Sequence, residues 1–288
     1  AMADITASMV KELRQMTDAA MMECKKALVE AEGDMDKAVD ILRTRGLAAV
    51  AKKAGRATNE GVVWPVVAAD AKSAIIFEMN CETDFVSGNA KYKEYAQRIG
   101  AAALAAKPAD MDAFKAAKGE DGVTVEEILT DAIHILGENI QVARFELIEA
   151  DAIASYIHMG GKIGVVVTFD TDCDATSEAF TEYGHGVAMQ VAADNPVAVD
   201  ASGVDESLVA HEREIYMAQA AESGKPQNIQ EKMVEGRINK YLAEVTLVGK
   251  SYIKDPDLSI AQLTEKTAKE LGGTIKITGY RRLCVGGE

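Results

Sequence analysis

The chain has 288 residues, of which 48% are hydrophobic and only five are proline. It is long enough for two domains, and its composition is typical of an ordered globular protein. The formal net charge of −15 argues against a nucleic-acid-binding protein, because phosphate contacts require clustered cations. No apolar run approaches the ~20 residues that a membrane span needs. We therefore expect a protein partner or a small ligand, with no direct nucleic acid contact and no membrane.

The four cysteines lie far apart in the sequence and form no C-x-x-C pair; they are Cys24, Cys81, Cys173 and Cys284. This spacing suits a reducing compartment and excludes a cysteine-based zinc site. We expect a cytoplasmic protein that holds no metal and no cofactor.

Residues 1–57 contain three short helical patterns, "ITASMVKELRQMT", "AAMMECKKALVEAEG" and "DMDKAVDILRTRG". Thr6 and Asp34 are expected as N-caps, and Gly33 as a C-terminal stop. Such a small three-helix module buries little apolar surface, and it usually serves as a docking unit. The stretch "LAAVAKKAGRATNEG" that follows predicts a helical extension and a linker.

The rest of the chain contains an internal repeat. Residues 124–145 align without gaps on 259–280 at an offset of 135, and 92–108 align on 180–196 at an offset of 88. In each pair a helix follows an apolar strand, or a capped helix ends at glycine before an alternating strand. Two ungapped blocks in the same order indicate a duplication rather than chance matching.

The repeat predicts an α+β fold in which two duplicated subdomains, 58–150 and 151–288, follow the helical module. Each has the order strand, strand, helix, helix, strand. The two offsets differ by 47 residues, so the second copy carries an insertion, which we expect to be a helical hairpin at about 205–241. Its facing residues are expected to be Leu208, Ile215 and Ala218 on one helix and Met233, Val234 and Ile238 on the other. The hairpin is either packing decoration or an arm for a partner.

Three motifs resemble catalytic or binding sites but lack a required residue. Gly249-Lys250-Ser251 has Glu244 where a phosphate-binding loop needs its first glycine. "DTDCDAT" (170–176) has Ala175 in place of the glycine that a calcium loop requires. Cys81 ends an apolar strand, where cysteine is usually a core residue, and the sequence pairs it with none of the four histidines. We therefore expect no catalytic residue.

The loop "EMNCETDFVSGN" (78–89) follows an apolar strand and places Phe85 beside Asp84. A phenylalanine at a strand exit is more often packed beneath its own helix than offered to a partner. The second copy, however, has "DTDCDAT" in the same place, without an aromatic residue. Since the scaffold does not require a ring there, Phe85 is interpreted as an addition that serves binding.

The segments "ITASMVKELRQMTDAAMMECKKAL", "AKKAGR", "NCETDFV" and "SGKPQNIQEKMVEGRINKY" together resemble the bacterial elongation factor Ts family, in colinear order over nearly the whole chain. The resemblance implies a guanine-nucleotide exchange factor that binds elongation factor Tu as a heterodimer or higher complex and promotes GDP release without covalent chemistry. It also implies a ubiquitin-associated-like N-terminal module. One departure is Asp18, which stands where many members have glycine.

The resemblance also places functional residues on this sequence. A loop that binds the partner and displaces its Mg²⁺ falls on Thr83, Asp84, Phe85 and Val86. Further partner contacts fall on Lys25, Leu136, Gly137 and His158. The alternative is a non-catalytic adaptor or holdase that binds proteins through the N-terminal module and the hairpin; an unrecognised hydrolase is a more distant alternative.

Overall fold

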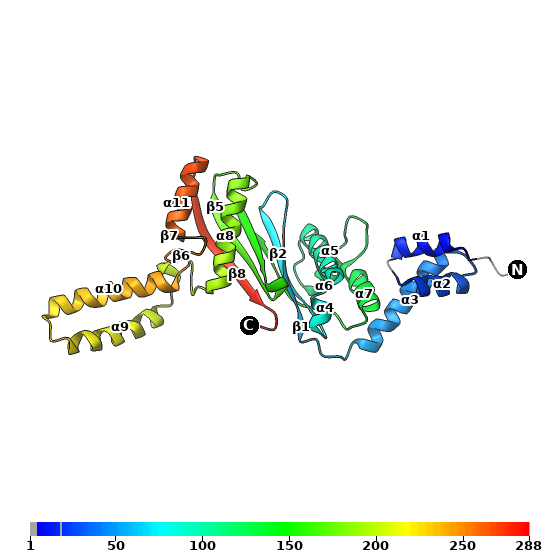
Figure 1. The fold of residues 1–288 in the computed structure, drawn as a ribbon, viewed down its shortest axis with the longest axis horizontal. Coiled ribbons are helices and arrows are strands. Elements are labelled where there is room, and N and C mark those ends of the chain that lie inside the picture. Colours follow the sequence, from blue (N-terminus) through cyan, green and yellow to red (C-terminus); the bar gives the residue numbers. More distant parts are fainter. Residues whose placement is uncertain (1–4, 18, 288) are drawn as a thin grey trace.

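The computed structural model describes residues 5–17 and 19–287, so Asp18 lies outside the described residues. The molecule is elongated, with the N-terminal helices at one end, a helical hairpin at the other, and two sheets between them (Figure 1). The mixed α+β class predicted from the sequence is confirmed. No helix among the described residues is both long enough and apolar enough to cross a membrane.

The N-terminal module consists of α1 (Ala7–Thr17), α2 (Met21–Glu30) and α3 (Met35–Lys53). The two expected caps are confirmed, since the Thr6 hydroxyl accepts a bond from the Met9 amide and the Asp34 carboxylate one from Lys37. Gly33 has φ +87°, which is the left-handed conformation that stops α2. A separate small core joins the three helices, built from residues such as Leu13, Leu28 and Leu42.

Helix α3 extends well beyond this small core and attaches the module to the rest of the chain. It packs against α7 (Val125–Leu136), where Gly46 lies beside the Thr130 side chain. Arg43 forms an ion pair with Glu127 of α7 at 2.6 Å. A helical contact, and not only a linker, therefore positions the module.

The first sheet is antiparallel, with the order β1-β2-β3: Glu60–Val67, Ser73–Cys81 and Gln141–Glu149. Pro65 lies within β1, which is tolerated because β1 is an edge strand. The short helix α4 (Asp84–Ser87) and the longer α5 (Ala90–Ala106), α6 (Met111–Ala116) and α7 follow β2. Phe77, Tyr92, Ile99, Phe114 and Ile128 belong to the core between this sheet and its helices.

The second sheet repeats this plan, with the order β4-β5-β8: Ala152–His158, Ile163–Thr171 and Ile275–Cys284. Its helices are α8 (Glu178–Asp194) and α11 (Ile260–Leu271), and a small hairpin pairs β6 (Ser251–Tyr252) with β7 (Asp255–Ser259). Short 3-10 turns span Met159–Gly161 (η1) and Ala201–Gly203 (η2). Both α7 and α11 begin with a capping box and end at a left-handed glycine, as the repeat predicts.

The two sheets pack face to face through a third apolar cluster, which includes Val63, Ile76, Val166 and Leu283. A side chain added at Gly164 would lie 2.7 Å from Val63, so the sheets approach closely there. The layers are therefore helices, sheet, sheet and helices (Figure 1).

An ion pair within the first sheet holds the end of the second sheet through further hydrogen bonds, since Arg144 also donates to the Cys284 carbonyl at 2.9 Å. Glu78 of β2 is almost fully buried and accepts a 2.8 Å bond from Arg144 of β3. Its other oxygen accepts bonds from Asn80 and from the Gly286 amide at 2.7 Å. The segment after β8 is thus tied to the first sheet.

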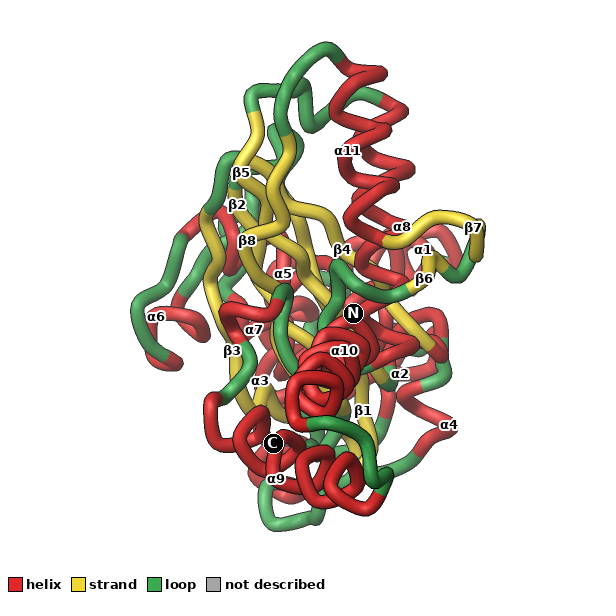
Figure 2. Tube along the Cα trace, turned by 90° about the vertical axis from the view of Figure 1, so that its left-hand side faces the viewer, coloured by secondary structure: helices red, strands yellow, loops and turns green. Residues whose placement is uncertain are grey.

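The insertion forms a hairpin of α9 (Glu206–Glu222) and α10 (Gln227–Val245), onto which the end-on view of Figure 2 looks. The expected α9 face was wrong, because Leu208, Ile215 and Ala218 are exposed. The helix is rotated by about one position, so that Val209, Tyr216 and Ala220 pack against α10 instead. On α10, Val234 and Ile238 are buried as predicted, whereas Met233, also expected on this face, is half-buried and lies outside the cluster. The observed hairpin also runs four residues beyond the predicted end at 241.

Candidate functional site

The loop after β2 is a short helical turn, α4, rather than an irregular exit. Thr83 is its N-cap: it has extended backbone angles, and its hydroxyl accepts a long bond from the Val86 amide at 3.4 Å. The Cys81 thiol donates to the Thr83 carbonyl at 3.2 Å. The turn therefore has a defined orientation relative to the strand that precedes it.

This turn separates the side chains of two neighbouring residues. Phe85 is 88% exposed, whereas Val86 packs against the first core. Asp84 is exposed beside Phe85 at the first position of α4. The loop therefore uses Val86 to attach itself to the core and presents a ring and a carboxylate to solvent.

Glu138 anchors the turn from the corner between α7 and β3. One oxygen of its carboxylate accepts bonds from the Glu82 and Thr83 amides, both at 3.0 Å. The other oxygen accepts the Thr83 hydroxyl at 2.6 Å. Hydrogen bonds to a charged acceptor are among the stronger bonds in proteins, so this corner restrains the loop backbone.

A reciprocal bond runs from the corner to the loop. The backbone amide of Asn139 donates to the Glu82 carboxylate at 2.8 Å, and the Arg56 guanidinium lies 3.4 Å from the same carboxylate. The Asn139 amide together with Arg56 holds the pKa of Glu82 below its ordinary value. The Asn139 side chain also donates to the Arg56 carbonyl, at 2.9 Å. The chain that leaves the N-terminal module is thus tied to the same corner.

Of the predicted site residues, Leu136 and Gly137 lie beside the Thr83–Val86 turn, whereas His158 and Lys25 lie elsewhere in the molecule. Leu136 packs on the first core and Gly137 ends α7 in a left-handed conformation, directly before Glu138. They therefore adjoin the turn that holds Thr83 to Val86. His158 lies at the end of β4 in the second subdomain, where Nδ1 is 3.1 Å from the Tyr156 hydroxyl.

Lys25 lies at the far end of the molecule, on α2, and lines a groove between α1 and α2. The groove has a volume of about 920 Å³ and is mostly apolar, with exposed Met21 and Met22 on its wall. Lys11 and Arg14 add positive charge to its rim. A groove of this kind fits an amphipathic element of another protein.

The other candidate that the sequence offered, Cys81, is not a reactive thiol in the structure. Cys81 is fully buried, and burial raises the pKa of its thiol to about 11, so it is not an activated nucleophile. Within the residues that the structure describes, no three His, Cys, Asp or Glu side chains gather as metal ligands.

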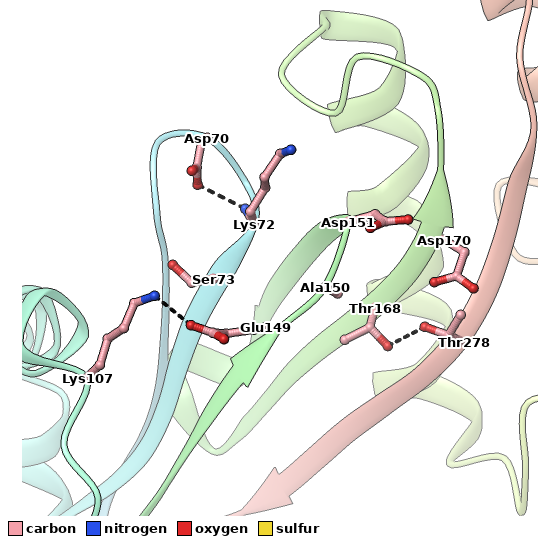
Figure 3. Close-up of a pocket in the computed structure, with 10 residues that line it drawn as sticks. All are labelled: Asp70, Lys72, Ser73, Lys107, Glu149, Ala150, Asp151, Thr168, Asp170 and Thr278. Carbon is pink, nitrogen blue, oxygen red and sulfur yellow. Dashed lines mark hydrogen bonds and ion pairs between the residues drawn. The ribbon is translucent and has the colours of Figure 1, made fainter.

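A cleft of about 580 Å³ opens between the strand ends farthest from the loop (Figure 3). Ser73 at the start of β2 lines it, so it lies roughly 25 Å from the loop along the strand. Its charged groups include Lys107, which pairs with Glu149 at 2.6 Å. None of the predicted site residues lines this cleft.

Glu138, Glu82, Asn139 and Arg56 were not predicted. The bonds of Glu138 and Asn139 to the loop join residues 55 or more positions apart, and Arg56 lies 26 positions from Glu82, so no local pattern reveals them. One signal was present in the repeat, where Glu138 aligns with Gly273. As at Phe85, the first copy has a large side chain where the second copy has none.

Comparison with known proteins decides the family. Residues 82–287 match the profile of the family described as "Elongation factor TS". The chain belongs to the elongation factor Ts family. It is 46% identical to the elongation factor Ts of Clostridium perfringens over 96% of this chain and 92% of that protein. It is 45% identical to that of Nitratidesulfovibrio vulgaris over 98% of this chain and 96% of that protein. The expected role as an elongation factor of protein biosynthesis is therefore confirmed at the level of the family.

Proposed function

We propose that this chain binds elongation factor Tu in its GDP-bound state and accelerates GDP release, so that GTP can bind. Membership of the elongation factor Ts family supports the partner. The observation that carries the proposal is the exposed Phe85 on a restrained turn. Exposure of a large aromatic ring to water is unfavourable, and burial of the ring by a partner would contribute to binding.

The proposed mechanism is mechanical and electrostatic. A P-loop GTPase holds its nucleotide through a backbone phosphate cradle and a bound Mg²⁺. Insertion of Phe85 would shift the elements around the metal, and Asp84 would place a carboxylate near the ligands of the ion. By linkage, the chain weakens nucleotide binding by the same factor by which nucleotide weakens binding of the chain.

The groove on the N-terminal module supports a division of labour. Lys25 and the exposed methionines would dock the partner, while the Thr83–Val86 turn, together with Leu136 and Gly137, would act on the nucleotide site. His158 would contribute a contact from the second subdomain. The complex would be a heterodimer or a higher assembly.

Release of a fluorescent GDP analogue from elongation factor Tu, followed by stopped flow, tests the proposal. Addition of the chain should raise the release rate in a saturable manner. An adaptor or holdase would bind elongation factor Tu and leave that rate unchanged, which would refute the exchange function.

A further inference from the structure

The second copy serves as an internal reference for the loop. Met79 of β2 pairs with Val142, and Phe169 of β5 pairs with Ile277, which is the repeat partner of Val142. The strands β2 and β5 therefore correspond at an offset of 90, and both carry a bulge at the same place. The helices α5 and α8 that follow correspond at 88. The connection in the first copy is thus two residues longer.

The shared part of the two connections is the tie to the corner. Asn139 donates its amide to Glu82 at 2.8 Å, and the equivalent Thr274 donates its amide to Asp172 at 2.7 Å. The two extra residues of the first copy come after this tie. They lie in the segment that contains α4, Asp84 and Phe85.

The corner itself differs at one position. An added Cβ at Gly273 of the second copy would lie 2.3 Å from Asp172 Oδ1 and 2.7 Å from Cys173 Sγ, so the loop side chains occupy the space that a side chain at this position would need. In the first copy the same position is Glu138, whose carboxylate lies between the corner and the loop and accepts three bonds from the loop. The shorter loop after β5 therefore packs directly on its corner at Gly273, whereas the longer loop after β2 contacts its corner through the Glu138 side chain.

We infer that Glu138 is a positioning residue, which spaces the longer loop from the corner and fixes the turn that presents Phe85. Its three bonds go to the loop, so it acts through the orientation of the loop. The inference rests on the proposed function for its effect on GDP release, but its structural part concerns the free chain alone. Without the carboxylate, the Glu82 and Thr83 amides lose their acceptor, and the turn keeps only its weaker contacts, among them the Cys81 thiol bond to the Thr83 carbonyl, the packing of Val86 and the Glu82 tie.

Amide hydrogen exchange in the free chain tests the structural part. Glu138→Ala should speed exchange of the Glu82 and Thr83 amides roughly tenfold to a hundredfold, because bonds to a charged acceptor are lost. Glu138→Gln keeps the length and one acceptor, so it should restore most of the protection. The control is Glu270→Ala, which removes the same charge from an exposed position on α11. Unchanged loop amides in Glu138→Ala, or no rescue by Gln, would overturn the inference.

GDP release tests the functional part. Glu138→Ala should lower the maximal stimulated rate by about tenfold or more, since misplacement of an acting group is costly, and change the half-saturating concentration by less than about threefold. Combined with Phe85→Ala it should cause little further loss, because both changes remove one effect. Full additivity, or a parent-like rate despite loosened amides, would overturn the inference. If Phe85→Ala itself leaves release unchanged, the proposed function fails, and the exchange data still decide whether Glu138 holds the loop.

Discussion

Phe85 and Val86 are adjacent in the chain, yet Phe85 is 88% exposed while Val86 packs against the first core. Because the two side chains point to opposite environments, Val86 anchors the loop and Phe85 is accessible to a partner. The two side chains should therefore respond differently to truncation.

Val86→Ala should lower stability, because it removes partly buried methyl groups from the core. We expect a loss of roughly 0.5–1.5 kcal/mol in the free energy of unfolding, measured by denaturant titration. An unchanged midpoint would show that Val86 does not anchor the turn.

Lys25→Ala should weaken complex formation and leave the maximal rate of GDP release nearly unchanged, because Lys25 lies in the groove of the N-terminal module, away from the loop. The half-saturating concentration should rise about threefold to tenfold, as for loss of one charged contact at an interface. Lys26→Ala is the matched control, since Lys26 is exposed on the same helix but does not line the groove. A collapse of the maximal rate in Lys25→Ala would contradict this division of labour.

Removal of residues 205–241 with a short glycine bridge should leave a folded core. The first copy has no such insertion, and the hairpin packs mainly on itself through Val209, Val234 and Ile238. The deletion variant keeps the backbone hydrogen bond from the Val197 amide to the Val245 carbonyl. It also keeps Leu247, which belongs to the core of the second subdomain. Loss of a cooperative melting transition, followed by circular dichroism, would show that the hairpin is integral to the core.

Glu82 should make the loop sensitive to acid. Its folded-state pKa lies below the ordinary value of 4.5, mainly because of the Asn139 amide and with help from Arg56. A depressed pKa stabilises the fold above the unfolded-state pKa, and this contribution disappears as pH falls through the folded-state pKa. The melting temperature of Glu82→Gln should therefore lie below that of the parent at pH 7, and the two should converge as the pH falls through the folded-state pKa of Glu82. A difference that persists at the lower pH would contradict the assignment.

Local signals in the sequence predicted much of the fold. The Thr6 and Asp34 caps, the two glycine-terminated helices and the repeat all depend on residues close together in the chain. The face of α9 was missed by one position, because apolar residues occupy two adjacent stripes of that helix and only packing against α10 selects between them.

The candidate site was predictable only where a local comparison of the two copies revealed it. The absence of a ring from the second copy pointed to Phe85, which the structure leaves exposed. The anchor at Glu138 was not predictable from the loop, because its bonds span 55 and 56 residues and exist only after β2 and β3 pair. The repeat offset of 88 also hid the longer first loop, which became visible only from the register of the strands.

The most direct measurement of the central claim is stimulated GDP release from elongation factor Tu by Phe85→Ala. A buried aromatic at an interface is worth ~2–4 kcal/mol, and each ~1.4 kcal/mol is a factor of ten in rate. We therefore expect release to slow between tenfold and several hundredfold at saturating factor, while the variant melts within a few degrees of the parent. Ile253→Ala, which truncates another exposed apolar residue, should release GDP at the parental rate. Parental release by folded Phe85→Ala would contradict the account, as would an unfolded variant whose residual folded fraction is fully active.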